Sequence, residues 1–159
     1  MMKKIFCTIL VVICATVLFS QEKKVSMYNE IAADASVGGY GSATASFILS
    51  YTGGVNVGKN FSTGIVLGYD PLPDYMLSAL KLKGQVPLNR VLFYTSAQGG
   101  VRTTFKETMP SIMLSAGVGI KSKKNIKGSF NMGPLVEFIN DPDENGWGTF
   151  MGIKLGYQF

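Results

Sequence analysis

The side chains that most often carry out catalysis are scarce in this chain. Its 159 residues include no His, and its two cysteines are Cys7 and Cys14. Both cysteines lie in an N-terminal segment that we expect to be removed. Hydrolysis and acyl transfer need a nucleophile, a base and an orienting group in contact with one another. The familiar catalytic sets cannot be built without imidazole or thiol, so we expect a protein that is not an enzyme and that binds no cofactor.

Residues 53–60, GGVNVGKN, come close to the phosphate-binding loop GxxxxGK[ST]. In that motif backbone amides hold phosphate, and a hydroxyl at the last position binds magnesium. Asn60 replaces the hydroxyl residue here. The residues that follow, 61–69, alternate like a strand, whereas the motif requires a helix. We therefore interpret the segment as a tight turn and reject nucleotide binding.

Asp141, Asp143 and Asn145, followed by Gly146, match the first half of a calcium-binding loop. Such loops place oxygen ligands at positions one, three and five and a glycine at position six. Position twelve, which should be Glu, is Gly152, and the flanking residues alternate like strands. Any calcium site here is expected to be weak and confined to the loop, and the alternative is a solvated hairpin loop.

Residues 1–20, MMKKIFCTILVVICATVLFS, are typical of a secretory signal peptide. Lys3 and Lys4 precede an uncharged apolar run, which ends where the sequence becomes polar at residues 21–24. The run is shorter than the ~20 apolar residues that a membrane-spanning helix needs. A lipid-anchored form would use Cys14, but Ile13 stands where such a site requires a small residue. We expect export, and a mature domain of residues 21–159 without cysteine.

The mature chain alternates between large apolar and small or polar residues with a period of two, which is typical of β-strands. The clearest example is the C-terminal segment, where Met151, Ile153, Leu155, Tyr157 and Phe159 share one face and Lys154 lies on the other. Eight such segments can be traced, at residues 30–40, 46–58, 61–70, 75–87, 91–103, 109–121, 126–140 and 149–159. An even number of strands suits a closed antiparallel barrel. The sequence therefore predicts an all-β, eight-stranded, up-and-down antiparallel barrel.

The polar face of these segments decides which side of the barrel contacts lipid. It carries charged side chains that would be costly in a dry core without partners. We therefore expect the apolar face to contact the bilayer and the polar face to line a hydrated lumen. The residues expected to form a charged network in this lumen are Asp34, Lys81, Lys83, Arg102, Glu137 and Lys154. Small polar residues on the same face, such as Ser50, Ser96 and Ser115, are expected to pack there rather than to react.

The segment ends and connections suggest an orientation. Aromatic residues near segment ends would form the girdles of a membrane barrel; these are Tyr69, Tyr75, Phe93, Phe138, Trp147, Tyr157 and Phe159. The connections at residues 59–60, 87–90 and 122–125 are short and basic or neutral, whereas those at 70–74, 104–108 and 140–148 are longer and more acidic. We expect the short set to face the periplasm and the long set to be extracellular.

These features resemble the small outer-membrane β-barrel proteins of the OmpX and OmpA-barrel type, in particular porin-like barrels of the Bacteroidetes type. The resemblance is one of pattern over the mature chain, and its most specific part is the C-terminal strand that ends at Phe159. It implies that Met151, Ile153, Leu155, Tyr157 and Phe159 act as the assembly signal read by the barrel-assembly machinery. It also implies a location in the outer membrane of a Gram-negative bacterium, with outer-membrane lipids as partners. No connection is long enough for a protruding adhesive sheet, so an adhesin role is not expected.

We therefore expect an integral outer-membrane barrel with a structural or envelope role and a contact to ligand or lipid through its loops. A first alternative is a narrow porin-like channel for small solutes, and a second is a secreted soluble barrel that binds an apolar ligand inside. Nucleic-acid binding is not expected, because the 15 basic residues are offset by 10 acidic ones and form no basic stripe.

Overall fold

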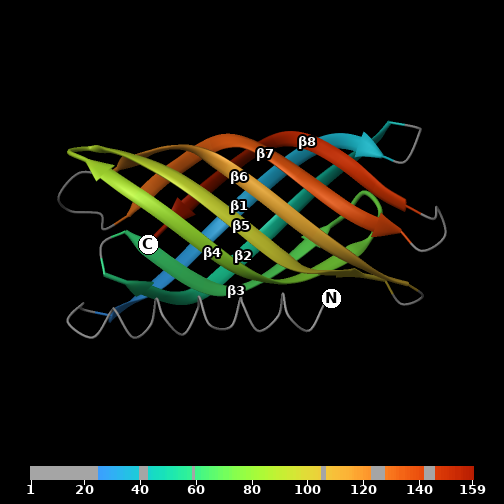
Figure 1. Ribbon diagram of the computed structural model, residues 1–159, viewed down its shortest axis with the longest axis horizontal. Helices are drawn as coiled ribbons and strands as arrows, with labels where there is room; N and C mark the ends of the chain where they lie inside the picture. The colour runs from blue at the N-terminus through green and yellow to red at the C-terminus, as the bar shows by residue number, and fades with distance from the viewer. Residues whose placement is uncertain (1–24, 40–42, 59, 105–106, 123–127, 142–145) are drawn as a thin grey trace, which may run out of the picture.

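The computed structural model describes residues 25–39, 43–58, 60–104, 107–122, 128–141 and 146–159. These residues form a closed antiparallel barrel in which each strand pairs with the next and β1 pairs with β8 (Figure 1). The strands are β1 Val25–Gly39, β2 Thr44–Val57, β3 Phe61–Asp70, β4 Tyr75–Leu88, β5 Val91–Thr103, β6 Thr108–Lys121, β7 Ser129–Asp141 and β8 Gly146–Gln158. Within the described ranges no helix is long and apolar enough to span a membrane.

The predicted fold class and all eight strand segments are confirmed, and three strand ends differ from the prediction by three residues or more. Strand β1 begins at Val25 rather than residue 30, because Val25 pairs with Val57 and the large side chain of Tyr28 turns inward. Strand β8 begins at Gly146 rather than 149, and β7 begins at Ser129 rather than 126.

Large apolar side chains cover the outside of the barrel, and polar ones fill most of the inside. Adjacent residues of β8 show the contrast, since Leu155 is 41% exposed and Lys154 only 2%. On β4, Leu80 is 66% exposed, whereas Lys81 is buried. The interior also contains two small apolar clusters, one of Ile48, Val66, Leu77, Ala79 and Met113 and one of Met109, Ile139 and Phe150. The expected distribution of faces is therefore observed, although the interior is not purely polar.

The two ends of the barrel differ in charge. At one end, where β1 begins and β8 finishes, the exposed charged residues in the described chain are Arg90 and Lys121. We call it the basic end. Asp74 and Glu107, with the half-buried Asp141, lie at the other, acidic end.

The expected difference in connection length holds for two of the three connections expected to be short, 58–60 and 89–90, and fails for the third. The connection between β6 and β7 spans residues 122–128 at the basic end and is longer than the four-residue connection at 142–145. The cause is that β7 starts later, and β8 earlier, than their apolar patterns suggested. Charge, rather than loop length, therefore distinguishes the two ends.

The aromatic residues near the strand ends do not all face outward. Tyr69 and Trp147 are exposed near the acidic end, and Phe93 and Phe159 are exposed near the basic end. Tyr75 instead packs against the interior cluster of Met109, Ile139 and Phe150. It shares the inward face of β4 with the buried Leu77 and Ala79, so its assignment to the girdle was wrong.

Strands β6 and β7 approach each other closely near Pro134. A Cβ added to Gly133 would lie 2.0 Å from the carbonyl oxygen of Ala116, and one added to Gly117 would lie 2.1 Å from that of Met132. Pro134 also lacks the N–H that a ladder hydrogen bond needs. Glycine is therefore required at both positions because backbone, rather than a movable side chain, fills the space.

We predict that Gly133→Ala destabilises the barrel by about 1–3 kcal/mol or more, because the added methyl group clashes with backbone. The matched control is Gly99→Ala, since a Cβ there would meet nothing within 4 Å. Urea unfolding of the refolded barrel measures both variants. Equal stabilities of the two variants would contradict this account of the β6–β7 contact.

Candidate functional site: the charged interior

Among the described residues, eight charged side chains are buried in the barrel interior, four acids and four bases. Each is at most 2% exposed. They are Glu30, Asp34, Asp70, Glu137, Lys81, Lys83, Arg102 and Lys154. The structure places all six residues of the expected lumen network in this set and adds Glu30 and Asp70. Their formal charges balance, so these ionised side chains give the interior no net charge.

The first group is centred on Glu30 and is called the Glu30 cluster; it comprises Glu30, Lys81, Lys83 and Tyr28. Lys81 and Lys83 both donate to the Glu30 carboxylate, Lys83 Nζ at 2.8 Å from Oε2. The Tyr28 hydroxyl donates to Oε2 at 2.6 Å. Lys83 also donates to Gln158 Oε1 at 3.0 Å. The cluster therefore joins β1, β4 and β8 across the lumen.

Lys83 is further held between two aromatic rings. Its Nζ lies 5.2 Å from the ring centroid of Tyr94 and 5.7 Å from that of Tyr28. Both distances are within the range of a cation–π interaction, which is strongest when the cation is removed from water. The rings thus help to stabilise the charge of Lys83, which shares the Glu30 carboxylate with Lys81.

Asp34 and Lys154 form a pair at the seam that closes the barrel. They stand directly opposite each other on β1 and β8, and Lys154 Nζ lies 2.9 Å and 2.8 Å from the two carboxylate oxygens of Asp34. Both side chains are buried, so the attraction is little screened by water or salt. This pair ties the first strand to the last.

The second group is the Arg102 cluster, formed by Arg102, Glu137, Asp70 and Ser46. Arg102 binds Glu137 through two hydrogen bonds, with Nε 3.0 Å from Oε1 and Nη2 bound to Oε2. Its Nη1 lies 3.3 Å from Asp70 Oδ2, and Ser46 Oγ donates to that same oxygen at 2.5 Å. The paired hydrogen bonds between guanidinium and carboxylate fix the relative orientation of the two groups and neutralise their charges. The cluster connects β2, β3, β5 and β7 in the part of the lumen nearer the acidic end.

Sequence reasoning missed Glu30 and Asp70 because both stood at the edge of a predicted strand. Asp70 had been placed partly in a connection, and Glu30 was the first residue of its segment. The available signal was spacing: Glu30 shares the inward face of β1 with Asp34, and Asp70 shares that of β3 with Val66. Tyr28 was missed because it lies before residue 30, where this strand was expected to begin.

The serines expected inside do lie there. Ser50, Ser96 and Ser115 are all buried, and the hydroxyls of Ser96 and Ser115 are 2.7 Å apart on adjacent strands. The hydroxyls of Ser96 and Ser115 are therefore hydrogen-bonded to each other. No imidazole or thiol lies within the described residues to activate a serine.

The residues of the expected assembly signal lie on the outer face of β8 and at its end. Met151, Ile153 and Leu155 are exposed, and the rings of Tyr157 and Phe159 stack with centroids 6.0 Å apart. Their recognition by an assembly machinery remains a prediction.

Two expectations fall wholly or partly outside the described residues. The signal peptide at 1–20 is one, and the calcium loop is the other, since Asp141 ends β7 but Asp143 and Asn145 are not described. In the described part of the chain there is no group of three or more His, Cys, Asp or Glu side chains that could hold a metal ion. Residues 53–57 belong to β2 and residues 61–70 to β3, so the loop that resembles a phosphate-binding motif joins two strands.

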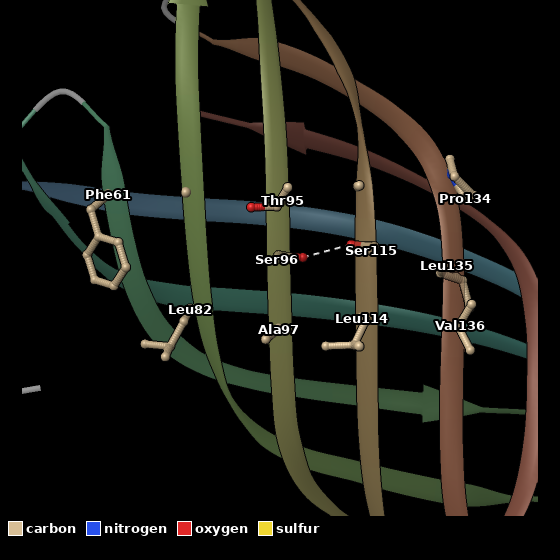
Figure 2. Close-up of a pocket in the computed structure, with 12 residues that line it drawn as sticks. Phe61, Leu82, Thr95, Ser96, Ala97, Leu114, Ser115, Pro134, Leu135 and Val136 are labelled. Carbon is tan, nitrogen blue, oxygen red and sulfur yellow. Dashed lines mark hydrogen bonds between the residues drawn. The ribbon is translucent and has the colours of Figure 1, made fainter. Parts of the chain in front are cut away.

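A shallow hollow of about 630 Å³ marks the outer surface over β3 to β7 (Figure 2). Its floor is made by small residues such as Gly84, Ala97 and Ala116, and larger side chains, among them Leu82 and Leu114, stand beside them. The hollow is predominantly apolar and faces outward. In a bilayer, hydrocarbon chains would fill it.

We predict that Lys154→Met alone destabilises the barrel by about 3–5 kcal/mol, because it leaves Asp34 buried without its cation. The double variant Asp34→Leu with Lys154→Met should cost less than the two single variants added together. Urea unfolding of the four proteins completes the cycle. Additive costs would show that the pair is not coupled.

Comparisons with known proteins show the fold. No family model matches the sequence, and no curated protein matches it. Among solved structures, the crystal structure of Neisserial surface protein A (NspA) is similar with a TM-score of 0.65 and 11% identity, over 86% of this chain and 98% of that one. The crystal structure of the N-terminal β-barrel domain of Pseudomonas aeruginosa OprF is similar with a TM-score of 0.51 and 13% identity, over 86% and 100% of the two chains. The chain thus has the same small barrel fold as these two proteins.

Proposed function

We propose that this protein is an integral β-barrel of the outer membrane of a Gram-negative bacterium, with a structural role in the cell envelope and no enzymatic activity. The observation that carries the proposal is the inverted distribution of side chains. Buried ion pairs fill the interior, and an apolar surface covers the outside on every strand. The expected signal peptide at residues 1–20 supports export, and NspA, which shares the fold, is named as a surface protein.

The apolar outer surface differs from that expected of a secreted soluble barrel. Soluble monomers rarely expose a continuous apolar patch of more than a few hundred Å². Here side chains such as Ile65, Leu80 and Ile153 are more than half exposed around the barrel wall. The interior that would have to hold an apolar ligand is occupied by charged residues instead. Lipid is therefore the better match for the outer face.

The filled interior favours a plugged barrel over a channel. In eight-stranded barrels side chains fill the lumen. Here the Glu30 and Arg102 clusters cross it, and apolar residues such as Ile48 and Leu135 are almost fully buried within it. We therefore propose a stiff, non-conducting barrel, with outer-membrane lipids and the barrel-assembly machinery as partners. Binding of ligand or lipid by the connections at the acidic end, and kinship with the Bacteroidetes-type barrels, belong to the same proposal.

The location is tested by expressing the full chain and separating the cell envelope from the soluble periplasm. We predict that the protein fractionates with the outer membrane and that its migration on a denaturing gel changes on heating, because a hydrogen-bonded closed barrel resists detergent until it is heated. A product found wholly in the soluble periplasm would overturn the proposal.

The contact with lipid makes a second, quantitative prediction. Leu80→Arg near the middle of β4 should destabilise the barrel by about 2–4 kcal/mol in vesicles, whereas Leu88→Arg at the end of the same strand should cost about 0–1 kcal/mol. Both leucines are exposed in the structure, so loss of packing does not distinguish them. Denaturant unfolding in vesicles measures the difference, and equal costs would argue against a membrane-embedded wall.

Planar-bilayer recording separates the plugged barrel from the narrow channel. We predict no stepwise openings from the wild-type protein, because the interior charges are paired across the lumen. Reproducible single-channel steps would instead favour the porin-like alternative.

A further inference from the structure

We propose that the mouth of the barrel at the basic end binds an oxyanion, either a carboxylate or a phosphate group of a small solute. A cavity of about 260 Å³ lies there. Its polar lining residues come from five strands around the circumference: Asn56, Gln85, Lys121, Ser129 and Gln158. Because these strands surround it, the cavity is the entrance to the lumen rather than a groove in the outer wall.

The lining offers several hydrogen-bond donors and includes no Asp or Glu side chain among the described residues. The Gln side chains contribute amide N–H groups, Ser129 contributes a hydroxyl, and Lys121 contributes an ammonium group. The amide nitrogen of Asn56 already donates to Ser26 Oγ and to the carbonyl oxygen of Met27. Lys121 is the charged lining residue, and it is exposed at the end of β6. Hydrogen bonds from such donors are strongest when the acceptor carries a negative charge.

Buried polar atoms without partners lie next to this lining. Asn131 is 3% exposed, and in the described chain neither its side-chain nitrogen nor its oxygen has a hydrogen bond. The hydroxyl of Tyr94, which is 4% exposed, likewise has none. An unsatisfied buried polar group is destabilising, so such groups usually meet a ligand or water.

The positions of these two residues connect them to the mouth. Asn131 lies two residues beyond Ser129 on the inward face of β7, and Tyr94 lies two residues beyond Leu92 on that of β5. Ser129 and Leu92 both line the cavity. The side chains of Asn131 and Leu92 meet over Gly119, where an added Cβ would approach Asn131 Oδ1 to 2.3 Å and Leu92 Cδ1 to 2.8 Å. The unpartnered groups therefore form a second layer directly beneath the entrance.

The charges around the mouth favour an anion. Lys83 donates to Gln158, a lining residue, and the Glu30 cluster to which it belongs has two lysines for one carboxylate. The exposed acids of the described chain, Asp74 and Glu107, are at the opposite end. A cleft lined by one sign of charge between walls of low dielectric concentrates counter-ions. The basic end should therefore attract anionic groups from its side of the barrel.

The test uses the folded barrel in an uncharged detergent, with isotope labels for NMR of the Asn side-chain amides. Sodium phosphate is added in one arm and sodium acetate in the other, and sodium chloride at equal ionic strength provides the reference. We expect a saturable shift of the Asn131 amide that exceeds the chloride reference in at least one arm. A response to phosphate alone would identify a phosphate site, and a response to acetate alone would identify a carboxylate site.

Two variants make the result specific. Lys121→Gln should weaken binding by about tenfold, the effect expected when a charged donor is lost. Arg90→Gln is the matched control, since the backbone of Arg90 contacts that of Lys121 at 2.8 Å but its side chain does not line the cavity, and it should leave binding unchanged. The proposal is overturned if neither anion gives a saturable shift, or if the two variants bind alike. Because detergent replaces the membrane, this outcome is independent of the proposed location.

Discussion

The pairing of four buried acids with four buried bases is the constraint on which the rest of this barrel depends. A charge transferred alone from water into the interior would cost several kcal/mol, so each must meet a partner. The chain meets this requirement with contacts between strands that are distant in sequence, such as Lys154 with Asp34 and Arg102 with Glu137. Once the charges are paired inside, the large apolar residues must occupy the other face of every strand.

This arrangement also explains the closed shape and the filled lumen. The Asp34–Lys154 pair lies on the seam between β1 and β8, so the same contact that neutralises charge helps to hold the barrel closed. The Arg102 cluster and the apolar residues around Met109 fill the part nearer the acidic end. The unpartnered groups Asn131 and Tyr94 lie toward the basic end. The interior is therefore asymmetric, with a packed half and a polar entrance.

Most of the fold could be predicted from the sequence. Strands with one apolar and one polar face require apolar and polar residues to alternate along the chain, and this alternation is visible in the sequence. The C-terminal segment with Leu155 outside and Lys154 inside is the clearest case. Strand ends were harder, since Tyr28 and Glu30 lie beyond the clear apolar alternation, and Tyr75 was assigned to the wrong face. The choice of partners could not be predicted at all. Whether Lys81 meets Glu30 or Asp34 depends on strand register and tilt across the lumen, which local residue patterns do not specify.

The most direct test of the central claim is the accessibility of nitroxide labels in lipid vesicles. Leu155→Cys places a label on the outer wall, and Leu72→Cys places one in the exposed connection between β3 and β4. The account predicts that the label at position 155 collides mainly with oxygen dissolved in the bilayer, and the label at position 72 mainly with a water-soluble nickel complex. Equal access of the nickel complex to both labels would contradict it.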